Sequence, residues 1–252
     1  MPIAFTRQVS PRIVDCALTH LDRQPIDADR AAAQHAAYED ALRDVGFDIV
    51  RLPYLADDPD AVFVEDTAIL LGEHAVITRP GTPSRADEVH STAAGLGNHC
   101  SVNWIAAGTL DGGDVLKIGD TLYVGQSSRT DAEGTASLES IVRPLGYRVV
   151  PVELGRCLHL KTAATYAGRN ILLVNPAWVD PSIFTGTEPL AVADDEPFAA
   201  NVVRAGEHLI YAAGSPKTAQ SLRDRGLDVT EVDLSELQKA EAGGTCMSLI
   251  SD

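Results

Sequence analysis

The chain lacks the segments and cysteine patterns that mark several classes of protein. Its 252 residues contain no run of eighteen consecutive apolar residues, so we expect no membrane-spanning helix. The N-terminal residues show no charged segment followed by a long apolar stretch, which argues against a signal peptide and predicts a cytoplasmic location. The four cysteines are far apart and include no C-x-x-C pair, which predicts free thiols rather than a zinc ribbon, a redox dithiol or a disulfide framework.

Positive charge is also scarce. Lys and Arg number 20 against 36 Asp and Glu, giving a formal net charge of -16, and no basic cluster interrupts the acidity. Such a surface repels phosphate backbones and anionic lipid, so we expect neither a nucleic-acid nor a membrane partner. The acidity favours a small cationic ligand, although excess acid also serves solubility alone. The sequence leaves open whether the protein is a monomer or a homodimer.

A unit of helix, glycine and strand repeats along the chain. In the first copy, apolar residues recur at helical spacing over 27–45, a glycine follows, and a strand is expected at 47–52. The same order recurs at four glycines: Gly46, Gly97, Gly146 and Gly226. The 80-residue gap before the last of them leaves room for a fifth copy around 189–192. Five such units predict a single α/β domain over 1–252, closed into a ring, although chance repetition of a common junction is the alternative.

The repeat brings chemically distinctive residues to similar places. Those at comparable distances after the glycines are Asp60, Glu65, Asp66, Asp111, His159 and Cys246. In a ring, such positions converge near the axis, so we expect carboxylates, an imidazole and a thiol to face one cavity. Taken singly, each has a plainer interpretation: a buried free cysteine, a core histidine, or acids in turns.

A thiol and an imidazole in one cavity predict nucleophilic catalysis. Cys246 follows two glycines and precedes an apolar run, which suits a presented nucleophile. A thiolate needs a proton acceptor and its leaving group needs an acid, and His159 oriented by Asp111 supplies both. The Asp-Gly-Gly-Asp stretch at 111–114 also suggests calcium, but its oxygen ligands are too few and a thiol is no partner for that ion.

Two turns carry arginine at 79–85 and 125–130. A guanidinium at a pocket rim binds a substrate carboxylate with bidentate geometry, which makes Arg85 and Arg129 candidates for that contact. The alternative is that these turns only begin the helices that follow, with Ser84, Thr130 or Asp131 as caps.

Taken together, six stretches resemble the dimethylarginine dimethylaminohydrolase family in their order and spacing. They are Phe63-Val64-Glu65-Asp66, Ile77-Thr78-Arg79-Pro80-Gly81, Leu110-Asp111-Gly112-Gly113-Asp114, Ser128-Arg129-Thr130, Leu158-His159-Leu160-Lys161 and Thr245-Cys246. The resemblance implies a five-bladed β/α propeller with pseudo-five-fold ββαβ-type repeats. It implies hydrolysis of Nω-methylated L-arginine to L-citrulline through a covalent cysteine intermediate, with no metal and no organic cofactor.

The same resemblance implies a role for each candidate residue. Cys246 would be the nucleophile, His159 the general acid and base, and Asp111 their partner. The remaining contacts would be Glu65 and Asp66 to the guanidinium, Asp60 to the α-amino group, Arg85 and Arg129 to the α-carboxylate, with Leu18 and the backbone of Ala240 completing the pocket.

Two alternatives stay open. Arginine deiminase resembles the chain in its nucleophile, histidine and Gly-Gly-Asp motif, but carries an aspartate two residues after the histidine, where this chain has Lys161. The loss of that carboxylate favours a methylated substrate over plain arginine. A non-catalytic binder of cationic amino acids on the same scaffold is the other alternative, because a fold does not fix a function.

Overall fold

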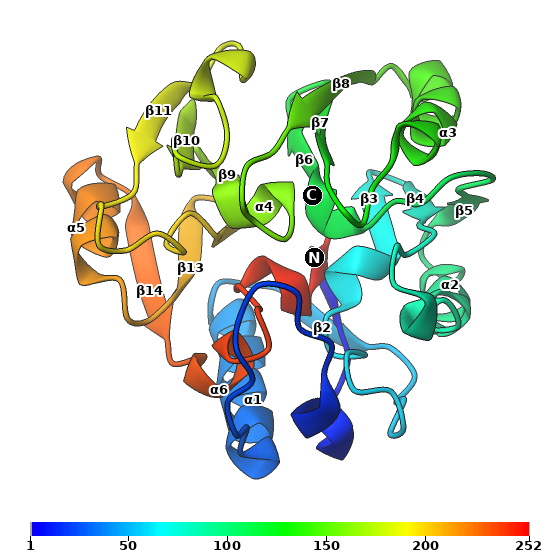
Figure 1. The fold of residues 1–252 in the computed structure, drawn as a ribbon, viewed down its shortest axis with the longest axis horizontal. Coiled ribbons are helices and arrows are strands. Elements are labelled where there is room, and N and C mark those ends of the chain that lie inside the picture. Colours follow the sequence, from blue (N-terminus) through cyan, green and yellow to red (C-terminus); the bar gives the residue numbers. More distant parts are fainter. Residues whose placement is uncertain (1, 252) are drawn as a thin grey trace.

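The computed structural model describes residues 2–251 and has an α/β fold. Within these residues, five three-stranded sheets are arranged around a common centre, with helices toward the outside (Figure 1). Their strands are β15 (Leu249–Ile250), β1 (Ile3–Thr6) and β2 (Asp48–Arg51); β3 (Ala68–Leu71), β4 (His74–Ile77) and β5 (Ser101–Trp104); β6 (Val115–Ile118), β7 (Thr121–Gln126) and β8 (Arg148–Glu153); β9 (Ala164–Gly168), β10 (Ile171–Val174) and β11 (Glu188–Ala191); β12 (Val202–Ala205), β13 (His208–Ala212) and β14 (Asp228–Val232).

Each sheet pairs its first two strands antiparallel and its last two parallel. β3 and β4 pair antiparallel, for example, and β4 pairs parallel with β5. In the sheet β15-β1-β2, Phe5 of β1 lies opposite Leu249 of β15, so the two ends of the chain share one sheet. The five predicted helix-and-strand units correspond to these five sheets.

The helices are α1 (Ala28–Asp44), α2 (Glu88–Leu96), α3 (Ala132–Val142), α4 (Leu160–Ala163), α5 (Pro216–Asp224) and α6 (Ser235–Gln238). In four of the sheets a helix of nine to seventeen residues connects the two parallel strands: α1, α2, α3 and α5. The exception is the unit around 189–192, where a short 3-10 turn, Pro181–Ile183, replaces the helix. None of the helices described is both long and apolar enough to cross a membrane.

A helical segment ends at or just before each of the four predicted glycines, and three of these glycines are left-handed. Gly46, Gly146 and Gly226 have φ of 97°, 91° and 76°, the left-handed conformation that a side chain disfavours. Gly97 differs, because its φ of -61° keeps it right-handed. At the start of α3, Asp131 acts as the expected cap by accepting a hydrogen bond from the Gly134 N–H.

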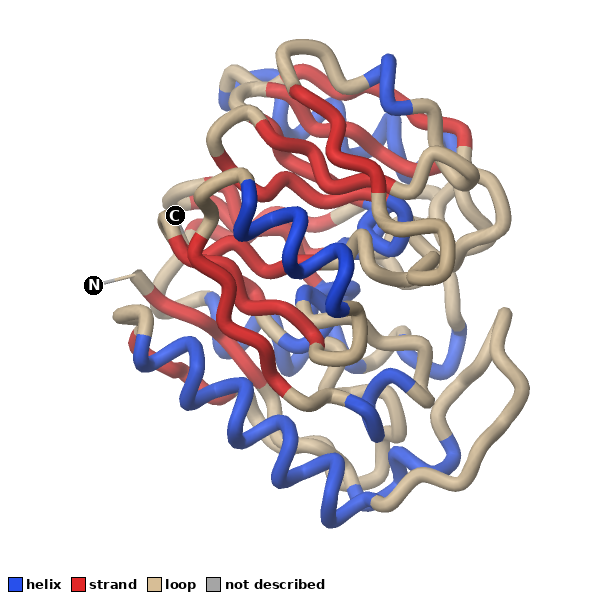
Figure 2. Tube along the Cα trace, turned by 90° about the vertical axis from the view of Figure 1, so that its left-hand side faces the viewer, coloured by secondary structure: helices blue, strands red, loops and turns tan. Residues whose placement is uncertain are grey.

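The strands and the loops occupy different parts of the molecule. In the turned view the two termini lie on one side, and long loops extend on the opposite side (Figure 2). Loops are where binding and catalytic groups gather when a rigid scaffold positions them.

Candidate active site

Seven of the ten predicted site residues line one small cavity of about 30 Å³. They are Asp60, Asp66, Arg85, Arg129, His159, Ala240 and Cys246. Leu18, Glu65 and Asp111 are not on its wall, and Ala17 stands where Leu18 was expected. Leu18 instead packs against the hydrophobic cluster around α1. A volume of about 30 Å³ accommodates only one or two water molecules, so the cavity is too small for an amino acid in this structure.

The segment 16–21, called the covering segment below, lies at the edge of the cavity, where Ala17 lines it. Both carboxylate oxygens of Asp60 accept the Ala17 N–H at 3.2 Å, and the Arg129 guanidinium donates to the Thr19 hydroxyl at 2.9 Å. Burial raises the pKa of Asp60 above its ordinary value. Two of the three groups predicted to bind the amino-acid end of a substrate, Asp60 and Arg129, therefore hold this covering segment in this structure.

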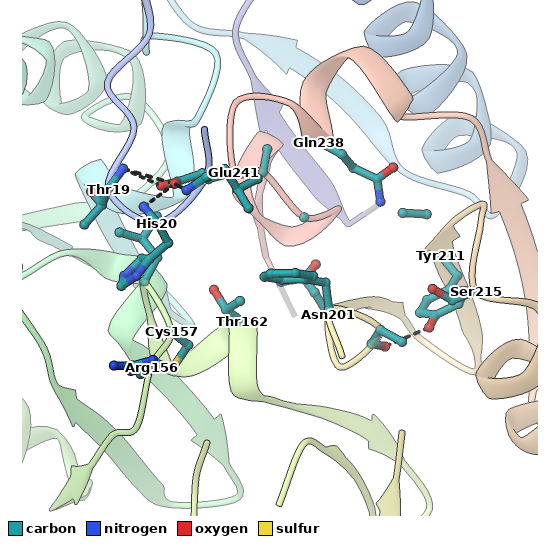
Figure 3. A pocket seen from close by; sticks show the side chains of 17 residues that line it. Thr19, His20, Arg156, Cys157, Thr162, Asn201, Tyr211, Ser215, Gln238 and Glu241 are labelled. Atoms are coloured by element: carbon teal, nitrogen blue, oxygen red, sulfur yellow. Dashed lines mark hydrogen bonds between the residues drawn. The ribbon is translucent and has the colours of Figure 1, made fainter. Parts of the chain in front are cut away.

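Glu241 is a third residue that holds the covering segment, and the sequence analysis did not predict it. Its carboxylate accepts the backbone N–H groups of Thr19, His20 and Leu21, the last two at 2.5 and 2.6 Å (Figure 3). Glu241 has φ of 61°, an unusual conformation for a residue other than glycine. The only sequence signal was its place beside Ala240.

Asp66 is held rigidly at the cavity wall. It lies on the 3-10 turn Val64–Thr67, and its Oδ2 pairs with Arg85 Nη1 at 2.6 Å. Arg85 also pairs with Glu88 at 2.8 Å, and its side chain is almost fully buried. Burial alone would raise the pKa of Asp66, but His159 and Arg85 hold it below its ordinary value. Asp66 therefore stays ionised and offers a negative charge to the cavity.

Asp111 orients the imidazole ring of His159. His159 Nε2 lies 3.1 Å from Asp111 Oδ2, and Asp111 Oδ1 accepts the Gly81 N–H at 2.8 Å. Burial would lower the pKa of His159, but the charges of Asp66, Asp114 and Asp111 raise it to about 10. The imidazole is therefore protonated at neutral pH. Gly113 is required here, because a Cβ on it would lie 2.7 Å from His159 Nδ1.

Asp114 is a buried acid that the sequence placed beside Asp111 without assigning it a role. It accepts the Leu160 N–H at 2.9 Å and the Ser127 hydroxyl at 2.6 Å, and burial raises its pKa to about 6. It therefore secures the start of α4, the helix that follows His159.

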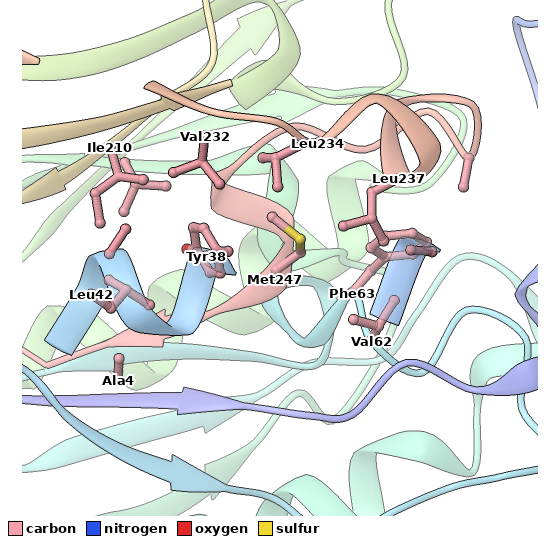
Figure 4. Packing of buried hydrophobic residues seen from close by; sticks show 14 of the residues in the cluster. Ala4, Tyr38, Leu42, Val62, Phe63, Ile210, Val232, Leu234, Leu237 and Met247 are labelled. Carbon is pink, nitrogen blue, oxygen red and sulfur yellow. The ribbon is translucent and has the colours of Figure 1, made fainter. Parts of the chain in front are cut away.

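Cys246 lies on the short 3-10 turn Thr245–Met247, and the last residue of the turn, Met247, anchors it in the core. Met247 is fully buried in the cluster that also contains Tyr38 and Leu237 (Figure 4). The Cys246 sulfur accepts the Gly243 N–H at 3.4 Å. Burial, followed by the charges of Glu65 and Asp66, raises the pKa of Cys246 far above its usual value. Without a ligand the group is therefore a neutral thiol.

Glu65 points away from the catalytic cavity. Its two oxygens accept Lys161 Nζ and the Thr245 hydroxyl, each at 2.7 Å, and Asn201 bonds the same threonine. Glu65, Lys161 and Thr245 line a different cavity of about 550 Å³, also bordered by the first strands of the sheets. Glu65 thus lies behind the nucleophile and supports the turn that carries it, and its predicted contact with a guanidinium stays a prediction.

Asp66, Asp111 and His159 offer potential metal-ligand atoms within 4.8 Å of one another. The imidazole already lies against Asp111, and Asp66 is already paired with Arg85. These hydrogen bonds and ion pairs explain why the three side chains lie close together.

Comparison with known proteins identifies the family of the chain. The chain is 41% identical, over 98% of its length and 95% of the relative, to N(G),N(G)-dimethylarginine dimethylaminohydrolase of Streptomyces coelicolor. It is 36% identical to the enzyme of the same name from Pseudomonas aeruginosa, over 88% of this chain and 89% of the relative. The chain belongs to the dimethylarginine dimethylaminohydrolase family. No sequence-family model matches it.

Solved structures of dimethylarginine dimethylaminohydrolase align along almost the whole chain. A cysteine-to-serine mutant of the Pseudomonas aeruginosa enzyme, complexed with citrulline, has a TM-score of 0.93 and 35% identity and covers 98% of both chains. A histidine-to-glycine mutant of a dimethylarginine dimethylaminohydrolase, present as an adduct with S-methyl-L-thiocitrulline, also has a TM-score of 0.93 and 35% identity, over 99% of this chain and 100% of that one. The N-terminal domain of the cyanobacterial arginine dihydrolase ArgZ, at 21% identity and a TM-score of 0.88, shares the fold alone.

Proposed function

We propose that this protein hydrolyses Nω-methylated L-arginine, either dimethylarginine or monomethylarginine, to L-citrulline and dimethylamine or methylamine. The observation that carries the proposal is the cavity in which a neutral thiol, a protonated imidazole and an ionised carboxylate meet: Cys246, His159 and Asp66. The complexes of family members with citrulline and S-methyl-L-thiocitrulline support the same chemistry.

The charge of the substrate activates the nucleophile. Two nearby carboxylates raise the pKa of Cys246, and a bound guanidinium offsets their charge and favours the thiolate. The thiol proton then passes to solvent, and the thiolate attacks the guanidinium carbon. His159 donates its proton to the departing amine as the C–N bond breaks, leaving a thiouronium intermediate on Cys246.

Hydrolysis reverses the role of the imidazole. His159, now neutral, removes a proton from water, and the oxygen attacks the carbon of the intermediate. The C–S bond breaks, citrulline forms and the thiolate is restored. Asp111 keeps the ring oriented through both steps and stabilises its protonated form.

The remaining predicted residues bind the substrate. Asp66 accepts from the guanidinium, Asp60 from the α-amino group, and Arg129 with Arg85 donates to the α-carboxylate. Arg85 is already paired with Asp66 and Glu88, so Arg129 is the freer of the two arginines. The backbone at Ala240 and the residues near Leu18 complete the pocket once the covering segment moves.

We further propose that the five sheets form a five-bladed β/α propeller that is one catalytic domain, 1–252, in a cytoplasmic enzyme that is a monomer or a homodimer. In support, first strands of neighbouring sheets contact one another, as β6 with β9 and β9 with β12, and β15 contacts β3. A single cooperative unfolding transition is the expected behaviour of one domain.

The function is tested by citrulline release from dimethylarginine, monomethylarginine and arginine, with Cys246→Ala as the control. We expect turnover of the methylated substrates and none by the variant, because the covalent step needs the sulfur. Equal or faster hydrolysis of arginine would favour an arginine deiminase instead. Binding of the amino acids without turnover by the parent would identify a non-catalytic binder.

A further inference from the structure

A second, much larger pocket lies beside the catalytic cavity. It has a volume of about 740 Å³, against about 30 Å³ for the cavity, and Figure 3 shows its walls. That size falls within the range of small-molecule sites, roughly 300 to 1,000 Å³. None of Cys246, His159, Asp60 and Arg129 lies on its wall, so the proposed reaction has not yet used this space.

The pocket borders the two reactive side chains. Leu158, the residue before His159, lines both the cavity and the pocket, and so does Ala242. Gly243 lines the pocket, and its N–H donates to the Cys246 sulfur at 3.4 Å. The space therefore begins beside the point where the C–N bond breaks, at the guanidine end of a bound substrate.

The pocket is walled on one side by Thr19, His20 and Leu21 of the covering segment and by Glu241, but the groups proposed to bind the amino-acid end of the substrate are not on its wall. Asp60, Arg129 and Ala17 line the catalytic cavity and not the pocket. A group that reaches the pocket is therefore carried by the guanidine nitrogens rather than by the α-carbon.

The lining disfavours a cationic group, because the exposed Arg156 lies on it, and one wall is apolar. Phe198 exposes 55% of its surface at this wall and packs against Trp178 with ring centroids 5.1 Å apart. The Glu241 carboxylate is already engaged by three backbone N–H groups, and Asn201 is engaged by Lys161 and Thr245. An exposed aromatic ring in a concave wall is a surface that an apolar ligand group covers.

We propose that this pocket receives an alkyl or arylalkyl substituent larger than methyl, carried by the leaving nitrogen of an Nω-substituted L-arginine. The inference rests on the proposed function and extends its substrate class. The bonds are the same: the Cys246 sulfur bonds to the guanidinium carbon, the C–N bond breaks, and His159 protonates the amine. The amine then leaves with its larger group through the pocket, and water completes the release of citrulline.

The test compares citrulline release from Nω-methyl-, Nω-propyl- and Nω-benzyl-L-arginine. Ser215→Trp fills the pocket from the residue before α5, away from the catalytic cavity. Gln220→Trp is the matched control, because it adds the same side chain on an exposed face of the same helix. We expect the parent to hydrolyse the benzyl substrate with kcat/KM within about ten-fold of the methyl substrate. Ser215→Trp should lower the benzyl-to-methyl ratio by about ten-fold or more, and Gln220→Trp should leave it unchanged.

The outcomes separate the two proposals. Failure to release citrulline from the methyl substrate would overturn the proposed function itself. Turnover of the methyl substrate, with neither turnover of nor competitive inhibition by the propyl and benzyl compounds, would overturn the pocket alone. So would an unchanged ratio in Ser215→Trp. If that variant does not fold, as judged by its thermal transition, Ser215→Leu gives the same comparison with a smaller side chain.

Discussion

Glu241 provides a direct test of whether the covering segment controls access to the nucleophile. Replacing Glu241 by Ala removes the acceptor for the backbone N–H groups of Thr19, His20 and Leu21. Hydrogen bonds to a charged group contribute about 1.5 to 3 kcal/mol each when well shielded. This carboxylate is partly exposed, so we take about 2 kcal/mol for the three together, which is about a 30-fold change in the open-to-closed equilibrium. Glu241→Gln keeps a neutral acceptor and should lose about half of this energy, roughly five-fold.

The measurement is the rate at which iodoacetamide alkylates Cys246 in the substrate-free enzyme, read by mass spectrometry of the peptide that carries it. Cys246 is partly exposed, but the cavity beside it holds only about 30 Å³, so we expect movement of the segment to make room for the reagent. We expect alkylation to accelerate by about 30-fold in Glu241→Ala, with the same pH dependence as in the parent.

Two controls make this result interpretable. Glu207→Ala removes an exposed glutamate from the turn between β12 and β13 and should change nothing. A shifted pH profile would mean that the substitution acts on the thiol rather than on the cover. An alkylation rate in Glu241→Ala equal to that of the parent would refute the reasoning.

Two other predictions follow from buried charges. Burial lowers the pKa of His35 to about 4, so folding favours its neutral form and stability is lost as pH falls from about 6.5 to 4. Denaturant unfolding at pH 7 and 4.5 should show His35→Leu losing less stability than the parent, by about 2 kcal/mol. The partly exposed His74→Leu should lose as much as the parent, and equal losses in His35→Leu and the parent would contradict the prediction. Lys161 pairs with Glu65 outside the catalytic cavity, so Lys161→Asp should lower the unfolding free energy and reduce kcat/KM for dimethylarginine and arginine by one common factor. A selective gain for arginine would restore the specificity role that the sequence suggested.

The repeat and the reactive residues were readable from the sequence because both depend on local pattern. Left-handed glycines follow helical segments at 46, 146 and 226, and these mark three units without any tertiary information. Cys246 and His159 converge because each lies at a similar place in its own unit. The unit with β10 and β11 was harder to recognise, since its connection contains a 3-10 turn and no helical periodicity.

Side-chain direction was not readable. Glu65 and Asp66 are adjacent and were given one role, but they lie on a 3-10 turn, where successive side chains point about 120° apart. One acid reaches the catalytic cavity and the other the cavity behind it. Lys161 pairs with Glu65 and therefore also lies at the second cavity. Such directions depend on backbone torsions within a four-residue turn, which no hydrophobic period encodes.

The cover over the cavity links recognition to access. Asp60 and Arg129 bind Ala17 and Thr19 in this structure, and the same two groups are proposed to bind the amino-acid end of the substrate. A substrate therefore exchanges one set of hydrogen bonds for another and does not leave a buried charge unpaired, which would cost several kcal/mol. Glu241 is different, because its carboxylate accepts hydrogen bonds from the covering segment and has no proposed hydrogen bond to the substrate. We therefore expect Glu241 to keep its hydrogen bonds to the segment when the substrate occupies Asp60 and Arg129.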